Sequence, residues 1–162
     1  MQDTVLHRLV TKSSPLLIIC ACLLAACSTY SDEDKKGFER QIEQFIHKKN
    51  WHLSESSGSG LFMEVLQEGS GEESVQFSSE VTIAYKGTFL NGKIFDQTEP
   101  GKPLHSKLSG LIMGFQEGLI GQKKGTKMRF IVPPQLGYGD EKTGDIPANS
   151  VLVYEVELLE VY

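Results

Sequence analysis

Alternation of apolar and polar residues in the second half of the chain limits the possible folds more than any other feature. It is clearest in EVTIAYKG (80–87), KMRFIVP (127–133) and VLVYEVELLEV (151–161). A period of two places successive side chains on opposite faces of a strand. LFMEVLQ (61–67) is a further expected strand that ends at a glycine-containing turn. Strands separated by glycine and proline turns predict an antiparallel sheet with one buried face.

GLIMGFQEGL (110–119) is the helical pattern within this strand-rich half. Ile112, Phe115 and Leu119 recur there with helical spacing. Gly114 and Gly118 lower the intrinsic helix propensity, so packing against the sheet must hold this helix in place. An antiparallel sheet whose apolar face is covered by one short helix is an α+β arrangement, and we expect that fold class here.

The N-terminal segment differs from the rest of the chain. A weakly basic head containing Arg8 and Lys12 precedes the apolar run PLLIICACLLAAC (15–27). This run is shorter than the roughly 20 apolar residues needed to cross a bilayer, and it is typical of a secretory signal peptide. LAAC (24–27) resembles the lipobox of bacterial lipoproteins, in which the cysteine is lipidated.

We therefore expect residues 1–26 to be a lipoprotein signal peptide and Cys27 to carry a lipid anchor. The anchor would hold the protein to a membrane of the cell envelope, facing the periplasm or the cell exterior. The alternative is an ordinary signal peptide cut near Ala26, which leaves Cys27 unmodified. In both cases Cys20 and Cys22 are removed, so one thiol remains and no internal disulfide can form.

Three further segments precede the strands. Residues 27–33 are expected to form a short polar tether, and SESSGSG (54–60) is the clearest linker. Between them, residues 34–53 place apolar side chains at helical spacing, with acidic residues at the start and basic ones at the end. We expect a short amphipathic helix whose apolar stripe packs either on the main domain, residues 61–162, or on a partner. The stripe consists of Phe38, Ile42, Phe45 and Ile46.

Charge and motif content argue against several classes of function. The formal net charge is −5, which argues against a nucleic-acid partner because nucleic acids bind basic surfaces. The sequence contains neither a Gly-x-Ser-x-Gly nor a His-Glu-x-x-His motif. His105 lies in a polar segment without an obvious acidic or cysteine partner. We expect neither a metal site nor a cofactor.

The stretch NGKIFDQT (91–98) places a ring and a charge side by side. Asn91 and Gly92 predict a tight hairpin turn in which both central residues adopt positive φ. Phe95 and Asp96 follow directly on the returning strand. Plain strand alternation would send one of them to the core and the other to water. A functional interpretation depends on what else the chain brings near this pair.

Two other features depart from an ordinary core. Tyr138 lies between two glycines in LGYGD, where a core residue would gain nothing from such flexible flanks. Ile146 precedes a proline, which holds its backbone extended and available for hydrogen bonding.

Four motifs occur together and in order: VTIAYKGTFLNGKIFD, GLIMGFQEGL, KMRFIVPPQLGYGD and IPANSVLVYEVELLEV. They resemble the FK506-binding-protein (FKBP) type of peptidyl-prolyl cis-trans isomerase over residues 60–162. The resemblance implies an antiparallel half-barrel sheet wrapped around the short helix, with an apolar pocket between them. It also implies proline-containing polypeptides as substrates, FK506-like molecules as ligands, and catalysis without a cofactor.

The family's motifs assign roles to individual residues of this chain. Tyr85 and Phe95 would form opposite walls of the pocket, and Asp96 would make a polar contact at its edge. Tyr138 would overhang the mouth, and Tyr154 would close the back. The other pocket residues would be Leu104, Leu111, Ile112 and Phe115.

The resemblance also implies that the backbone N–H of Ile146 binds the carbonyl before the substrate proline. Two positions depart from the family pattern. Phe115 stands where the family commonly has tryptophan, which gives a smaller pocket floor without an indole N–H. The stretch 96–104 is one residue shorter than in familiar members, and Leu104 replaces a frequent aromatic residue.

The function implied by this resemblance is a lipid-anchored prolyl isomerase that assists the folding of cell-envelope proteins. Two alternatives remain open. One is a binding module that recognises a partner's proline segment without useful turnover. The other is an accessory lipoprotein of an envelope assembly, such as the gliding-motility machinery with which some similar lipoproteins are associated.

Overall fold

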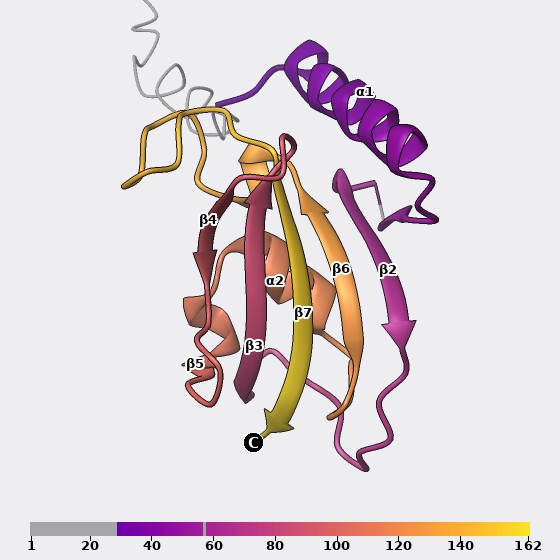
Figure 1. Ribbon diagram of the computed structural model, residues 1–162, viewed down its shortest axis with the longest axis vertical. Coiled ribbons are helices and arrows are strands. Elements are labelled where there is room, and N and C mark those ends of the chain that lie inside the picture. Colours follow the sequence, from indigo (N-terminus) through magenta and orange to yellow (C-terminus); the bar gives the residue numbers. More distant parts are fainter. Residues whose placement is uncertain (1–28, 57) are drawn as a thin grey trace, which may run out of the picture.

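The computed structural model describes residues 29–56 and 58–162 (Figure 1). The expected signal peptide, residues 1–26, and the expected lipidation site, Cys27, lie outside the described residues. None of the helices in the described part of the chain is long and apolar enough to cross a membrane.

An antiparallel sheet of seven strands dominates the described chain, in the order β1-β2-β6-β7-β3-β4, with β5 also paired to β3. The four expected strands are confirmed as β2, β3, β6 and β7, and the α+β fold class is confirmed with them. The strands are β1 Ser54–Ser56, β2 Leu61–Gln67, β3 Glu80–Phe89, β4 Ile94–Gln97, β5 Leu104–Lys107, β6 Lys127–Val132 and β7 Leu152–Val161.

The main core lies between one face of this sheet and the helix α2 (Met113–Leu119), which follows the short 3₁₀ helix η3 (Leu108–Gly110). Figure 1 shows α2 behind the strands. The two glycines of α2 permit this close packing. A Cβ atom at Gly114 would lie 2.7 Å from Val132, and one at Gly118 would lie 2.6 Å from Phe130. The residues that weaken the helix on its own therefore let it approach the sheet.

A second helix, α1 (Asp32–Lys49), packs on the domain through a separate apolar cluster. Its Ile42 is fully buried and packs with Ile131 of β6 and Val153 of β7. These two residues alternate along their strands with Phe130 and Tyr154, which belong to the main core. Alternation therefore places α1 and α2 on opposite faces of the sheet. The apolar stripe of α1 thus packs on its own domain.

The helix α1 begins two residues earlier than expected, which shortens the expected tether 27–33. Ser31 is its N-cap: the Ser31 hydroxyl accepts the N–H of Asp34 at 3.1 Å, and the Asp34 carboxylate accepts the N–H of Ser31 at 3.0 Å. This reciprocal pair satisfies two backbone donors that would otherwise lack partners at the start of the helix.

The segment expected to be a linker, residues 54–60, contains the strand β1, so that expectation was wrong for its first half. Its three residues pair with the start of β2. Gly58 and Gly60 adopt φ of 71° and 88°, which lets the chain turn back onto β2 within a few residues. The segment before β1 contacts β6 through a cation–π interaction. The ring centroid of Trp51 lies 3.7 Å from the guanidinium carbon of Arg129.

Candidate active site

The hairpin between β3 and β4 forms as expected, although its turn differs in detail. The N–H of Gly92 donates to the carbonyl of Phe89 at 2.8 Å, and the N–H of Phe89 donates to the carbonyl of Lys93 at 3.0 Å. Gly92 adopts φ of 85°, whereas Asn91 keeps a negative φ. The loop therefore has three residues and a single left-handed position, which is another common hairpin geometry.

A break in the register between β3 and β4 explains how the side chains of Phe95 and Asp96 can both lie on the same side of the sheet, although the two residues are adjacent in sequence. Gly87 pairs with Asp96, but the next residue, Thr88, pairs with Ile94. Phe95 is the extra residue of a β-bulge, and a bulge redirects side chains from strict alternation. Its ring packs edge-on against Tyr154 at 5.6 Å. A Cβ atom at Gly87 would lie 2.6 Å from this ring, so the approach depends on glycine.

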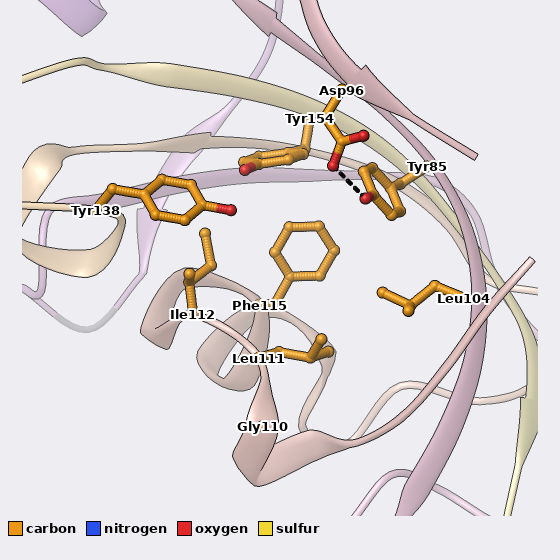
Figure 2. Close-up of a pocket in the computed structure, with 9 residues that line it drawn as sticks. All are labelled: Tyr85, Asp96, Leu104, Gly110, Leu111, Ile112, Phe115, Tyr138 and Tyr154. Atoms are coloured by element: carbon orange, nitrogen blue, oxygen red, sulfur yellow. Dashed lines mark hydrogen bonds between the residues drawn. The ribbon is translucent and has the colours of Figure 1, made fainter. Parts of the chain in front are cut away.

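Asp96, the neighbour of Phe95, faces a cavity of about 230 Å³ that opens between the sheet and α2 (Figure 2). Residues from β3, β4, β5, η3, α2, β7 and the loop before β7 meet around it. They are Tyr85, Asp96, Leu104, Gly110, Leu111, Ile112, Phe115, Tyr138 and Tyr154. The structure thus brings together all but two of the predicted pocket residues, and it adds Gly110, which offers no side chain for sequence analysis to recognise.

The two predicted residues that do not line the cavity are Phe95 and Ile146. Phe95 instead packs edge-on against Tyr154, which does line the cavity. Ile146 is buried against the core, and its backbone N–H donates to the carbonyl of Thr143 at 2.9 Å. The expectation that this N–H is available is therefore wrong for this structure. Thr143 and Ile146 flank a two-residue turn in which Gly144 adopts φ of 55°. The N–H of Ile146 is therefore already hydrogen-bonded within this turn.

The floor of the cavity is aromatic. Phe115, only 5% exposed, meets Tyr154 edge-on with ring centroids 4.7 Å apart, and it meets Phe130 of β6 in the same way at 5.5 Å. Edge-to-face pairs of this kind are favourable beyond the area that they bury. The floor is therefore a packed aromatic surface, and Leu111 and Ile112 extend it along the side (Figure 2).

Oxygen atoms are placed along the opposite wall. The Tyr85 hydroxyl donates a hydrogen bond of 2.5 Å to Oδ2 of Asp96, as the dashed line in Figure 2 shows. Burial raises the pKa of Tyr85 above its ordinary value, and the hydrogen bond to Asp96 raises it further. Burial also raises the pKa of Tyr154, and the Tyr138 hydroxyl beside it adds to that effect. Both phenols are protonated at neutral pH and serve as hydrogen-bond donors.

His105 lies on β5 and does not reach the cavity. Its Nε2 is 3.2 Å from Oε2 of Glu80, so the expectation that it lacks an acidic partner was wrong. Glu80 precedes it by 25 residues and meets it through the pairing of β5 with β3. Within residues 29–56 and 58–162, no three His, Cys, Asp or Glu side chains are grouped so that they could hold a metal ion.

Comparison with known proteins places this geometry in a family. The family model described as FKBP-type peptidyl-prolyl cis-trans isomerase matches residues 71–159. The isomerase FkpA of Buchnera aphidicola from Schizaphis graminum is 43% identical over 134 residues, which cover 79% of this chain and 52% of that protein. FkpA of Escherichia coli K12 is 41% identical over 132 residues, which cover 81% of this chain and 47% of that protein. The chain spans about half the length of these curated relatives.

Solved structures agree with this assignment. The crystal structure of FkpA from E. coli superposes with a TM-score of 0.68 at 39% identity and covers 80% of this chain and 61% of that one. A peptidyl-prolyl cis-trans isomerase from Pseudomonas syringae superposes with a TM-score of 0.65 at 28% identity and covers 82% of this chain and 98% of that one. This chain therefore belongs to the FKBP-type peptidyl-prolyl cis-trans isomerase family.

Proposed function

We propose that this protein is a peptidyl-prolyl cis-trans isomerase that accelerates the isomerisation of X-Pro bonds in proteins folding in the cell envelope. The observation that carries the proposal is the cavity itself. An aromatic floor built on Phe115 faces a wall that carries the Tyr85–Asp96 hydrogen bond and the Tyr138 hydroxyl. A proline ring fits the apolar floor, and the oxygen atoms give the flanking peptide groups an orientation.

The chemistry needs no acid or base. Rotation about a peptide bond has a barrier of roughly 18–20 kcal/mol because it breaks amide resonance. The twisted amide carries less charge separation than the planar one, so an apolar floor favours it relative to the ground state. Each lowering of the barrier by about 1.4 kcal/mol accelerates the exchange tenfold, and a thousandfold gain needs about 4 kcal/mol. The equilibrium between cis and trans stays unchanged.

The substrate carbonyl requires a donor, and we assign that role first to the Tyr138 hydroxyl. It points into the cavity from the loop above α2 (Figure 2). The N–H of Ile146 already donates to the carbonyl of Thr143. It would bind the substrate carbonyl only if it donated to both oxygens at once or if the bond to Thr143 broke. Tyr138 needs no such rearrangement.

The N-terminal sequence supports a proposal about the location of the protein. We propose that Cys27 carries a lipid anchor and that the domain works at a membrane surface facing the periplasm or the cell exterior. Its partners would be proline-containing polypeptides and the membrane, without nucleic acid. FK506-like molecules would bind in the same cavity. Metabolic labelling with a palmitate analogue tests the anchor, and a Cys27→Ser variant is the control.

Binding without turnover is the second candidate, and the engaged N–H of Ile146 is the observation that favours it. A proline-limited refolding assay with purified protein separates the two. Acceleration of the slow phase in proportion to protein concentration supports catalysis. A slow phase that stays unchanged while a prolyl peptide binds the protein would instead support the binding module.

A further inference from the structure

Tyr30 precedes α1 and lies outside residues 71–159, which the family model matches, yet its side chain reaches the loop between β6 and β7. Its side chain is 8% exposed, and its ring meets Phe38 of α1 edge-on at 5.4 Å. The Tyr30 hydroxyl donates to Oδ1 of Asn149 at 2.8 Å, across 119 residues of sequence. Figure 1 shows the start of the described chain beside this loop. The N-terminal segment is therefore fastened to the loop that carries Tyr138.

Asn149 connects the two limbs of that loop. It adopts a left-handed conformation with φ of 59°, and its backbone N–H donates to the carbonyl of Gly139 at 2.9 Å. Gly139 directly follows Tyr138, and its own N–H donates to the carbonyl of Pro134 at 3.0 Å. Short hydrogen bonds thus link the Tyr30 hydroxyl, through the Asn149 side chain and backbone, to the residue next to Tyr138.

The same region contains a surface hollow whose lining includes Thr29, Tyr30, Asp140 and Tyr138. Tyr138 therefore lines this hollow as well as the cavity of the candidate active site. The N-terminal segment contacts the Tyr138 loop on the side of the surface hollow, and a substrate would contact the same loop on the side of the cavity. We therefore expect a contact on the outer side of the loop to change the fraction of molecules in which Tyr138 is positioned for a substrate.

We propose that Tyr30 is a positioning residue for prolyl isomerisation, which holds the Tyr138 loop in its substrate-binding geometry through Asn149. The inference rests on the proposed function of the cavity. It extends the working unit of this protein beyond the family domain, because Tyr30 lies ahead of the matched residues 71–159. Release of the N-terminal segment would then weaken substrate binding without the replacement of any residue that lines the cavity.

The test replaces Tyr30 with phenylalanine, which keeps the ring against Phe38 and removes the hydroxyl. Tyr162→Phe is the matched control, because Tyr162 is 65% exposed and its ring contacts His105 on β5. Loss of this hydrogen bond should lower the fraction of molecules whose loop is in the substrate-binding geometry. KM for a prolyl peptide should therefore rise about three- to tenfold, while kcat at saturation stays near wild type. The Tyr162→Phe variant should keep the wild-type KM.

Amide hydrogen exchange gives a readout that is independent of turnover. In the Tyr30→Phe protein, exchange should become faster in residues 137–150 and stay unchanged in β6. Asn149→Gly, which keeps the left-handed backbone accessible, should reproduce the effect, and the double variant should add nothing further. If the wild type binds prolyl peptides without catalysis, their dissociation constant replaces KM.

Unchanged exchange in the loop would overturn the inference whether or not the wild type catalyses. Faster loop exchange in the Tyr30→Phe protein with an unchanged KM or dissociation constant would also overturn it. Tyr30 would then stabilise the loop without any effect on the binding of prolyl peptides. Failure of the wild-type protein to accelerate isomerisation counts against the proposed function alone.

Discussion

The hydroxyl of Tyr85 on β3 donates a hydrogen bond to the carboxylate of Asp96 on β4, at the rim of the cavity. The bulge at Phe95 makes this contact compatible with the edge-on packing of the Phe95 ring against Tyr154. The adjoining ring and carboxylate therefore have separate tasks on the same side of the sheet. Phe95 holds the aromatic wall, and Asp96 fixes the polar edge of the site.

Replacement of Asp96 with alanine should lower kcat/KM about tenfold, because a hydrogen bond to a charged group contributes roughly 1.5–3 kcal/mol and this one is partly exposed to water. Asp96 is exposed on a short edge strand, so the free energy of unfolding should change little. A protease-coupled peptide assay and urea unfolding measure the two quantities. Glu99→Ala is the control, since Glu99 pairs with Lys102 on the exposed surface of the same segment. Equal activity of the wild type and Asp96→Ala would contradict the role of Asp96.

The same substitution should have opposite effects in the two helices. Gly118→Ala should destabilise the protein by about 1–3 kcal/mol through overpacking, because the new Cβ would lie 2.6 Å from Phe130. Gly37→Ala in α1 should stabilise it by about 0.5–1 kcal/mol, because the nearest atom would be Nη2 of Arg40 at 4.0 Å. Urea unfolding of both variants measures the difference. If Gly118→Ala proved as stable as the wild type, α2 would not pack on the sheet as closely as described.

Truncation of Ile42 to alanine should reduce the free energy of unfolding by about 2–5 kcal/mol, because this side chain is fully buried against the sheet. The cavity lies on the other face, so kcat/KM at a temperature where the variant is folded should remain close to wild type. Calorimetry and the peptide assay provide these values. Wild-type stability of Ile42→Ala would mean that α1 is not docked on the domain in solution.

Stability should fall at alkaline pH because of Tyr154. Burial raises its pKa above the ordinary value of 10.0 in the folded protein, whereas the unfolded chain titrates near that value. Below about pH 9 both states hold the proton, and Tyr154 adds no pH dependence. Above about pH 10 only the unfolded state loses it, so the free energy of unfolding falls by up to about 1.4 kcal/mol per pH unit. Urea unfolding should show a shallower decline for Tyr154→Phe. The same decline in both proteins would contradict the raised pKa.

The strands and the pocket helix could be predicted because their signals are local. Alternation in β3, β6 and β7 follows directly from which side chains are buried, and the glycines of α2 indicated that packing must hold it. The position of α1 was left open, although a signal was present. Ile131 and Val153 are apolar on the face opposite to Phe130 and Tyr154, which requires a second covering layer.

Other features depend on contacts that neither strand alternation nor helical spacing indicates. The bulge at Phe95 depends on the register between β3 and β4. The N–H of Ile146 is engaged by the tight turn between Thr143 and Ile146. The rule for a residue before proline predicts the backbone conformation of Ile146 but not the hydrogen-bond partner of its N–H. Tyr30 is a single aromatic residue in a segment expected to be a polar tether. Its contact with the loop can be recognised only from the fold, which brings Asn149 next to it.

The measurement that tests the central claim most directly is the refolding of a protein whose slow phase is limited by a trans-to-cis prolyl bond, with increasing amounts of the purified wild-type protein. Uncatalysed prolyl exchange takes tens to hundreds of seconds. We predict that the rate of the slow phase rises in proportion to enzyme concentration, that its final amplitude is unchanged, and that Asp96→Ala lowers the slope. A rate that stays constant at all concentrations of folded protein would contradict catalysis by this cavity.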